Sequence, residues 1–302
     1  MDALTLSWTR DAHGTIAPTG PGIPTTPPEG ASLMTRARAL STLLPDEAVV
    51  ARRTAAWIWG LDVLPSGVNE IDWEIEVITP APSQSTADPP VITADHVDLP
   101  PEHVREKAGV RLTSPPRTAL DCARWLPQAE AVAALDQFLR LGVKAAELPA
   151  MARGLPGYRG NRRLREILSI GDPGAASPGE SWTRAAIIRT GFPRPSTQVP
   201  VPGPQGRWLY VDLGYPEFRV GMEYDGERHH TGPTARAHDD RRRRWLAKEQ
   251  GWEIIPVTKD FLSRPAPYLE ALLTALLTRG WKPTDATMAK IAAHLTTPTR
   301  RH

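Results

Sequence analysis

Apolar residues dominate two short runs in the C-terminal third of the chain, Trp208–Leu213 and Val220–Asp225, and each run carries carboxylates near its end. Runs rich in aromatic and β-branched residues predict β-strands. Successive side chains of a strand point to opposite faces, so Glu223 and Asp225 share a face of the second strand, and Asp212 takes one face of the first. If the strands pair as a hairpin, three carboxylates converge at one end of a sheet.

Helical spacing of apolar residues predicts most of the remaining elements. We expect helices over residues 33–44, 48–59, from 114 onward, 128–141, 177–190, 235–250 and 269–277, and a short helix within 153–170. Further strands are expected over residues 73–78, 109–112 and 252–258. The C-terminal order of helix, hairpin, helix and strand is typical of a mixed sheet flanked by helices. The fold class is therefore predicted to be α/β, or α+β over the whole chain.

The chain has 302 residues, which exceeds the usual size of one domain and predicts two. Prolines and glycines crowd residues 1–30, a stretch that we expect to be flexible. A mainly helical domain is predicted over residues 31–170 and an α/β domain over residues 177–280. Residues 281–302 then form a C-terminal helix or tail.

The charge of the chain is informative in its distribution. The net charge is only +2, but residues 153–165 contain five arginines and no acid, and Arg241–Arg244 is an unbroken arginine run. Basic stripes of this kind fit a phosphate-binding surface, and they also fit a solvated helix face. On a phosphate-binding surface they supply an affinity for nucleic acid that weakens with salt and has no sequence preference. The candidate nucleic-acid contacts are Arg241, Arg242, Arg244 and Lys248.

The single cysteine, Cys122, excludes an internal disulfide and a multi-cysteine zinc site. It lies in an apolar pattern, which indicates a buried structural thiol. No apolar run approaches the length of a membrane span, and the N-terminus shows no signal-peptide pattern. These features predict a cytoplasmic protein.

The convergent acids predict a cation site. Two carboxylates about 4 Å apart repel each other by roughly 4 kcal/mol at an effective dielectric constant near 20. Protonation of one acid or binding of a cation relieves that repulsion, and hard divalent metals prefer oxygen ligands. Magnesium, or manganese in its place, is the expected ion, with Asp212 and Glu223 as first ligands and Asp225 as a third ligand or outer partner. For either acid alone, a solvated hairpin end is the ordinary explanation.

The order Glu180, Asp212, Glu223, Asp225 resembles the PD-(D/E)XK nuclease superfamily, and within it the branch related to very-short-patch-repair endonucleases. The matching stretches are Val211–Leu213, Val220–Gly226, His229–His230, Asp240–Arg243, Leu246, Gly251–Trp252 and Val257–Thr258. The resemblance covers about residues 177–261. It implies a restriction-endonuclease-like fold and magnesium-dependent hydrolysis of DNA phosphodiester bonds, with the four acids in the catalytic site.

One position departs from that superfamily. The usual lysine two residues after the second acid is replaced by Asp225, so the attacking water needs another partner. His229 and His230 are the candidates, because an imidazole with a pKa near roughly 6.5 can accept a proton at neutral pH or bind a metal. Lys248 is a further candidate, and loop histidines without a chemical role also fit the sequence.

Glu180 has two explanations, and the sequence leaves both open. The pattern Ser177-x-x-Glu180 is a capping box, in which the glutamate side chain reaches back to the backbone N–H of the N-cap residue. The resemblance implies instead a role in the active site, and one side chain could serve both purposes.

Two stretches of the N-terminal half, residues 51–61 and 113–121, resemble AbiEi-type proteins, the antitoxin partners in abortive-infection toxin–antitoxin systems. The resemblance covers about residues 34–170, and it implies DNA and a cognate toxin protein as partners. On structural grounds alone, residues 117–121 are explained by a helix that docks through Ala119 and Leu120.

Three functions fit these observations. The first is a magnesium-dependent DNA endonuclease in phage defence or DNA repair. The second is a nuclease-like fold that does not cut and serves as a DNA-binding antitoxin or transcriptional regulator, and the replacement of the lysine favours it. The third is a structural partner of a toxin, in which the basic stripes meet an acidic protein.

Overall fold

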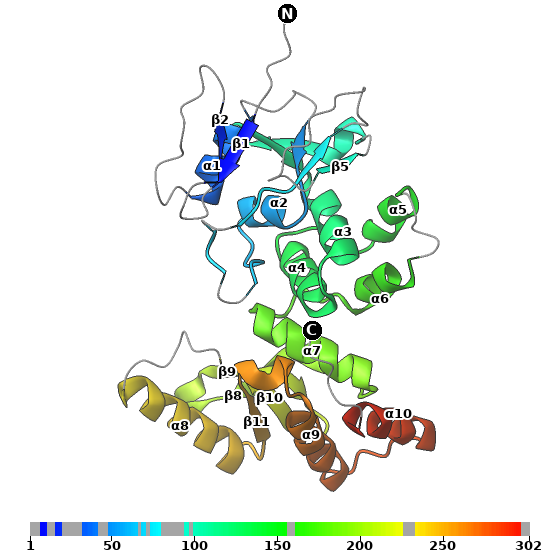
Figure 1. Cartoon of the computed structure of the whole chain (residues 1–302). Helices are drawn as coiled ribbons and strands as arrows, with labels where there is room; N and C mark the ends of the chain where they lie inside the picture. The colour runs from blue at the N-terminus through cyan, green and yellow to red at the C-terminus, as the bar shows by residue number, and fades with distance from the viewer. Residues whose placement is uncertain are drawn as a thin grey trace, which may run out of the picture. The chain divides into compact units, whose positions relative to one another are not determined.

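The computed structural model describes residues 7–10, 16–19, 32–41, 48–65, 68–70, 73–79, 94–96, 99–155, 161–225 and 233–296 (Figure 1). The chain divides into two compact units. The N-terminal unit comprises Met1–Pro127 and Leu141–Leu168, and the C-terminal unit comprises Gln128–Arg140 and Ser169–His302. Both units combine helices with a sheet, which confirms the predicted α/β class. Among the described helices, none is long and apolar enough to cross a bilayer.

The N-terminal unit contains a five-stranded mixed sheet in the order β5-β4-β3-β7-β6. Its strands are β3 (Val49–Val50), β4 (Val77–Thr79), β5 (Ala94–His96), β6 (Val104–Lys107) and β7 (Val110–Thr113). A separate ribbon pairs β1 (Ser7–Arg10) with β2 (Ile16–Thr19). The region that the sequence predicts to be mainly helical therefore also carries a sheet of its own.

Helices accompany this sheet. They are α1 (Leu33–Ser41), α2 (Arg52–Ile58), α3 (Pro115–Trp125), α5 (Leu148–Arg153) and α6 (Arg162–Ile170). The short 3-10 helix η2 (Pro101–His103) precedes β6. Side chains of α1 and α2 join those of the strands in one core, which includes Leu33, Ile58 and Leu112.

The helix expected over residues 48–59 begins only at Arg52. Val49 and Val50 form β3 instead, where they are buried between β4 and β7. β-branched side chains favour that setting, and burial in a sheet outweighs their place in a helical pattern. The strand expected over residues 73–78 is also shorter, since β4 begins at Val77. The strand expected over residues 109–112 is confirmed as β7.

Helix α3 confirms the structural explanation of residues 117–121. Ala119 and Leu120 are fully buried. Arg117 Nε donates to both carboxylate oxygens of Asp121 at 3.0 Å, and both side chains are buried. The charges of Arg117 and Asp121 therefore neutralise each other, while Ala119 and Leu120 between them pack α3 into the core.

The C-terminal unit is built on a four-stranded mixed sheet in the order β11-β10-β9-β8. Its elements are α4 (Gln128–Arg140), α7 (Pro178–Thr190), β8 (Ser196–Pro202), β9 (Trp208–Tyr215), β10 (Val220–Tyr224), α8 (Pro233–Lys248), β11 (Glu253–Val257), α9 (Ala266–Thr278) and α10 (Asp285–Thr296). Residues 220–222 pair antiparallel with residues 213–215, which confirms the predicted hairpin. Strands β10 and β11 run parallel, with α8 as their crossover.

Helices cover both faces of this sheet (Figure 1). On one face, α7, α9 and α10 contribute to a core that includes Ile187, Leu272 and Ile291. On the other face, Leu246 of α8 packs with Trp252 and with valines of β8 and β9. The mixed sheet flanked by helices is the arrangement that the order of elements predicts.

Strand β8 is not predicted, because prolines interrupt its sequence. Pro200 and Pro202 lie within it, and Pro195 precedes it. Proline lacks the backbone N–H and is confined in sheets to edge strands and similar positions. Among the described strands, β8 pairs only with β9 and so forms an edge of the sheet.

Helix α4 belongs to the C-terminal unit, although it lies within the range predicted for the N-terminal domain. It packs against α7, and a buried ion pair joins the two helices. Arg184 Nη2 lies 2.5 Å from Asp136 Oδ2, and neither side chain is more than 1% exposed. Asp136 also accepts from the Asp172 N–H at 2.7 Å, and Arg184 donates to the Ile170 carbonyl at 2.5 Å. The pair thus anchors the chain segment between the two helices as well.

Candidate carboxylate site

Three of the predicted site residues meet where the start of α7 approaches the end of the β9–β10 hairpin. Glu180 comes from the first turn of α7, Asp212 from β9 and Glu223 from β10. Glu180 is 6% exposed and Glu223 is 7% exposed. The charges of both glutamates raise the pKa of Asp212, so the three carboxyl groups lie within electrostatic reach of one another.

Glu180 completes a capping box at the start of α7. Its N–H donates to Ser177 Oγ at 3.3 Å, and its Oε1 accepts from the same hydroxyl at 2.9 Å. Its Oε2 accepts from the Ala176 N–H at 2.9 Å, one residue before the N-cap. Glu180 therefore caps the start of α7, but through the Ala176 N–H and the Ser177 hydroxyl and not through the N-cap N–H that the pattern predicts, and the same carboxylate also lies beside Asp212.

A glycine lets β10 approach this helix end. A Cβ atom at Gly179 would lie 2.2 Å from Cε1 of Tyr224, a distance at which no side chain fits. The Tyr224 ring also meets the Trp182 ring edge-on, with centroids 6.5 Å apart. The Tyr224 N–H donates to Asp212 Oδ2 at 2.9 Å, and this bond fixes one oxygen of the central acid.

Gln198 of β8 is a member of the site that the sequence does not predict. Its Nε2 donates to Glu180 Oε2 at 2.9 Å and to Asp212 Oδ1 at 3.3 Å, so one amide group links two acids. Its backbone φ is +46°, a left-handed value that is uncommon outside glycine. The strand register pairs Thr197 with Leu213 and Val199 with Val211, so regular pairing continues on both sides of Gln198 and Asp212. A polar residue within a run of valines and prolines is the feature of the sequence that could have marked Gln198 as a site residue. The prolines argue against a strand there, so the feature is easily missed.

The strand β9 changes face at this position. Regular alternation would place Val211 and Leu213 on the same face. Instead, Val211 packs in the core on the α8 side, and Leu213 packs in the core on the α7 side. The irregular backbone around Gln198 and Asp212 thus places the central acid between the two faces of the sheet.

Arginines of α8 neutralise two of the acids. Arg242 Nη1 lies 2.6 Å from both Oε1 and Oε2 of Glu223, and its Nη2 donates to the Tyr210 carbonyl. Arg243 Nη2 lies 3.1 Å from Asp225 Oδ2. Glu223 and Asp225 are therefore each held by a cation from the same helix.

Three further basic residues of α8 face outward. Arg241, Arg244 and Lys248 are exposed, while Leu246 is fully buried and sets which side of the helix meets the sheet. Of the predicted nucleic-acid contacts, Arg242 is engaged with an acid of the site. The outer three lie on the surface that the sequence assigns to phosphates.

The predicted magnesium ligands have suitable chemistry but no open arrangement. Carboxylate oxygens suit magnesium, yet Glu223 is held by Arg242, and Asp225 is held by Arg243. Within the described ranges, no group of three or more His, Cys, Asp or Glu side chains could hold a metal ion. The predicted proton-transfer residues, His229 and His230, lie outside those ranges. As arranged, the acids fit an arginine better than a divalent ion, and magnesium binding stays a prediction.

The surroundings of Asp212 favour its protonated form. Its pKa rises from an ordinary 3.8 to about 7, first because burial disfavours the charged carboxylate. The negative charges of Glu180 and Glu223 add to the rise, and the hydrogen bonds from Tyr224 and Gln198 oppose it. Near neutral pH the site therefore retains a proton on Asp212 in part of the molecules, which relieves some of the repulsion between its acids.

We expect the contribution of Asp212 to stability to fall as the pH rises from about 4 to about 7. In that range the unfolded chain releases a proton that the folded state retains, so unfolding becomes more favourable, and the change is complete above the folded pKa. Asp212→Asn removes this dependence, and the variant gains stability over the wild type in mildly alkaline buffer but not in acid. Melting curves of both proteins across the range measure the effect. A difference between them that stays constant with pH would contradict the raised pKa.

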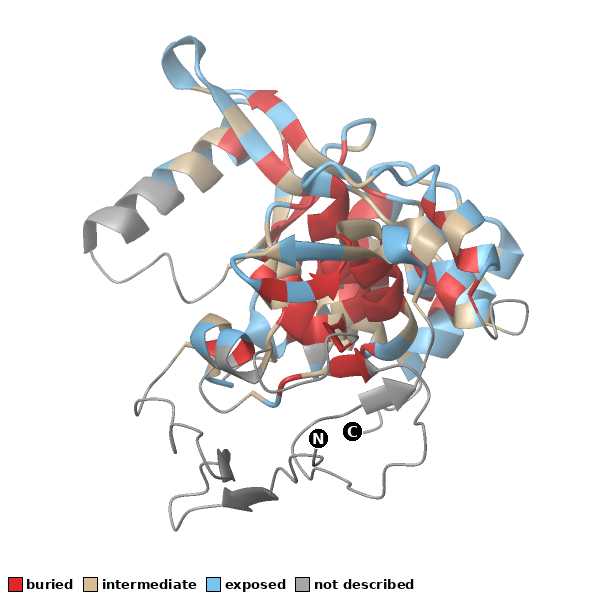
Figure 2. Ribbon diagram, turned by 90° about the horizontal axis from the view of Figure 1, so that it is seen from above, coloured by how far each residue is buried: buried red, intermediate tan, exposed pale blue. Residues whose placement is uncertain are grey.

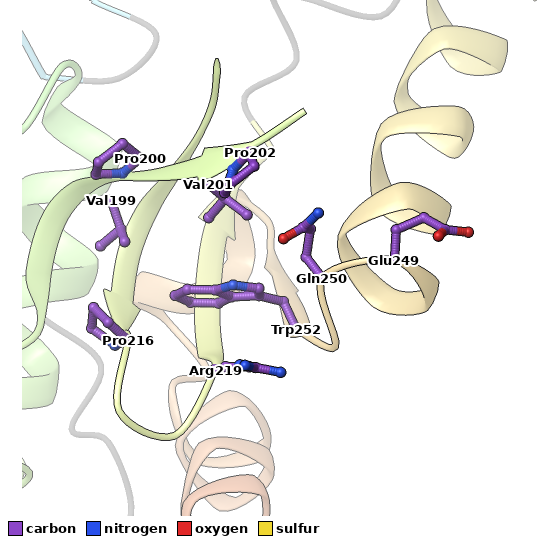
Figure 3. Close-up of a pocket in the computed structure, with 9 residues that line it drawn as sticks. All are labelled: Val199, Pro200, Val201, Pro202, Pro216, Arg219, Glu249, Gln250 and Trp252. Carbon is purple, nitrogen blue, oxygen red and sulfur yellow. The ribbon is translucent and has the colours of Figure 1, made fainter. Parts of the chain in front are cut away.

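A cavity of about 290 Å³ lies on the α8 side of the same sheet (Figure 3). The Trp252 ring lies at its centre, between Val199 and Val201 of β8 and Pro216 of the hairpin turn. None of Glu180, Asp212, Glu223 and Asp225 lines it. The cavity is therefore separate from the carboxylate site.

Comparison with known proteins shows a relative that spans most of the chain. Over 257 residues, the chain is 31% identical to an uncharacterized protein of Mycobacterium tuberculosis, named MT2308 in strain CDC 1551 / Oshkosh and Rv2248 in strain ATCC 25618 / H37Rv. The match covers 82% of this chain and 88% of the mycobacterial protein. The chain belongs to the same family. Because most of both proteins is aligned, this family shares more than the N-terminal unit alone.

A second match concerns part of the chain. Residues 48–170 match the AbiEi antitoxin C-terminal domain, which confirms the AbiEi resemblance of residues 51–61 and 113–121. The matched range includes α4, so it reaches into the C-terminal unit. No solved structure matches the chain. The endonuclease resemblance of residues 177–261 lies outside the matched range and stays a prediction.

Proposed function

We propose that the protein is a DNA-binding antitoxin of the AbiEi type, whose C-terminal unit has a nuclease-like order of acids but does not cut DNA. The observation that carries this proposal is the match of residues 48–170 to the AbiEi antitoxin C-terminal domain. The carboxylate site supports it, because Arg242 contacts both carboxylate oxygens of Glu223. The cation that the crowded acids require is then supplied by the chain itself.

We assign the DNA contacts to the exposed side of α8. Arg241, Arg244 and Lys248 are exposed and follow at intervals of three and four residues, a spacing that places side chains on one side of a helix. Residues 241–248 contain no acid. Basic side chains of this kind bind phosphates, and binding weakens with salt because cations are released from the DNA when the complex forms.

Charge reversal on α8 tests DNA binding. The probe is duplex DNA from the region upstream of the gene. We expect Arg241→Glu/Arg244→Glu to weaken its binding and to reduce the slope of log affinity against log salt by about two, one for each lost phosphate contact. Fluorescence anisotropy in a salt series measures both quantities. Arg189→Glu, at an exposed position of α7, is the matched control and should bind as the wild type does. An unchanged slope in the double variant would contradict the assignment.

Antitoxin action has its own test. Cells that express the product of a neighbouring gene, the candidate toxin, should stop growing, and co-expression of this protein should restore growth. The growth curves of both cultures are the measurement. Growth arrest that this protein does not relieve would refute the antitoxin function while leaving DNA binding in place.

The meeting of Glu180, Asp212 and Glu223 favours a second function, a magnesium-dependent endonuclease in phage defence or DNA repair. Crowded acids of this kind are typical of sites that bind a divalent ion. Asp212, Glu223 and Asp225 would hold the ion, which would supply Lewis-acid polarisation of a phosphate and a bound water of lowered pKa. Arg242 and its neighbour would then have to release their acids, so this function requires a different arrangement of α8 side chains.

In that second function Glu180 completes the acidic pocket, and His229 or His230 takes up the proton of the attacking water. Incubation of supercoiled plasmid with the protein and magnesium tests it, and nicking should disappear in Asp212→Ala. Equal nicking by both proteins would refute the assignment of the site. Calorimetry that shows no uptake of magnesium or manganese, with an oligonucleotide present, would refute the hydrolytic function altogether.

A further inference from the structure

Two aromatic side chains are exposed on one face of the β8–β9 hairpin. Trp208 is 59% exposed and Tyr210 is 49% exposed. They are two residues apart on β9, so they lie on the same face of the strand. Leu209 and Val211 alternate with them and pack in the core with Leu246 of α8. The face that carries the two aromatic residues is therefore not used by that core.

Two prolines of β8 extend this face. The strand register pairs Pro202 with Trp208 and Pro200 with Tyr210, and both prolines are exposed. Cross-strand partners lie side by side on one face, so these four side chains form a continuous row, here called the aromatic ladder. Figure 2 shows exposed and buried stripes alternating along the hairpin. A contiguous exposed apolar surface of this kind marks an interaction site more often than scattered apolar residues do.

The rings of the aromatic ladder have no stacking partner within the part of the chain that the structure describes. Trp125 of the N-terminal unit offers a contrast. It is 52% exposed, but Arg52 and Arg124 lie over its ring at 4.9 Å and 5.0 Å from the centroid. The ring of Trp125 is thus covered by arginines of its own unit, whereas Trp208 and Tyr210 can accept a ring from outside.

The strands of the aromatic ladder hold no acid, and basic residues lie at the hairpin tip and on α8, which packs on the opposite face of the hairpin. Residues 199–211 and 241–248 contain no acid. Helix α8 is fastened beside the hairpin, because Trp245 Nε1 donates to the Pro202 carbonyl at 2.9 Å and Arg242 donates to the Tyr210 carbonyl. The exposed basic residues of the hairpin tip and of α8 are Arg207, Arg241, Arg244 and Lys248. A partner that fits this surface combines flat rings with negative charge.

We propose that the aromatic ladder is a stacking platform for the unpaired bases of single-stranded DNA. This inference rests on the proposed DNA-binding function and adds a substrate class to it. Exposed aromatic side chains stack with bases of any sequence, and basic residues beside them hold the backbone. Bases within a duplex already stack on one another, so their faces are not available to the ladder.

Other occupants fit the surface less well. Addition of a strand from a second copy of the chain needs backbone donors on the edge strand, and the prolines of β8 remove them. An acidic protein would use the basic residues but would leave the flat rings without a specific partner. Along β9, the ladder leads toward Asp212, so a bound strand would run toward the carboxylate site.

Fluorescence anisotropy of the full-length protein with a labelled oligothymidine strand tests the platform. We expect Trp208→Ala and Tyr210→Ala each to weaken single-strand affinity about tenfold, the effect of losing one stacked base. Trp208→Phe, which keeps a flat ring, should retain most of the affinity. Trp125→Ala is the matched control and should bind as the wild type does. Melting curves establish that each variant is folded.

Several outcomes would overturn the platform. Unchanged single-strand affinity in both Trp208→Ala and Tyr210→Ala is one, and an equal loss in Trp125→Ala is another. An equal loss for duplex and single strand would also overturn it, because stacking requires unpaired bases. A wild-type protein that binds the upstream duplex but no single strand would refute the platform and leave the proposed function intact. A wild-type protein that binds neither would refute both.

Discussion

Asp136→Leu is expected to lower the free energy of unfolding by about 3–5 kcal/mol, because it leaves the guanidinium of Arg184 charged and unpaired in the core. Arg184 is fully buried, and its Nη2 lies 2.5 Å from Asp136 Oδ2. Removal of one partner exposes the other to the full cost of burying an isolated charge. Urea denaturation at neutral pH measures the loss.

A double variant separates this cost from a simple loss of packing. Asp136→Leu/Arg184→Met should recover most of the lost stability, since apolar side chains then replace the whole ion pair. Recovery is incomplete, because the Asp172 N–H loses its acceptor and the Ile170 carbonyl keeps only the hydrogen bond from Arg194. If the loss of unfolding free energy in the double variant equals the sum of the losses in the two single variants, the charges are not coupled.

Arg242→Met has the second-largest expected effect. It should lower the free energy of unfolding by about 2–3 kcal/mol at neutral pH. Glu223 is 7% exposed and lies beside the other two acids of the site, so its charge depends on the guanidinium that contacts it at 2.6 Å. Arg243→Met is the matched control. The ion pair of Arg243 and Asp225 is more exposed, with side-chain exposures of 39% and 29%. Arg243→Met should therefore lower the free energy of unfolding by less than about 1 kcal/mol. Equal losses in the two variants would contradict the special position of Arg242.

The same variant distinguishes the two proposed functions. If the chain supplies its own cation, magnesium leaves the melting temperature of the wild type unchanged and raises that of Arg242→Met, in which Glu223 is free to bind an ion. Melting curves with magnesium and with a chelator provide the comparison. Stabilisation of the wild type by magnesium would favour the endonuclease.

Local rules predict the elements that position the carboxylate site. Ser177 and Glu180 form a capping box, which predicts the start of α7, and Gly191 predicts its end, where φ is +112°. The apolar runs around Asp212 and Glu223 predict the two strands of the hairpin. These signals depend on neighbours in the sequence, so a single chain carries them.

The partners of the acids depend on tertiary packing, and the sequence does not reveal them. Gln198 lies on a strand whose prolines conceal it. Arg241 to Arg244 look alike in the sequence, and only the burial of Leu246 decides which of them reach the sheet. The short strand Val49–Val50 was hidden for a similar reason, since its pairing partners lie far along the chain.

The placement of α4 has a consequence for how this protein can be divided. The antitoxin match ends at residue 170, but α4, inside that range, packs on α7, which begins at Pro178. A gene fragment cut at the end of the match would encode a helix stripped of its cover, with an apolar flank prone to aggregation. A boundary at residue 170 therefore separates two helices that share one buried interface.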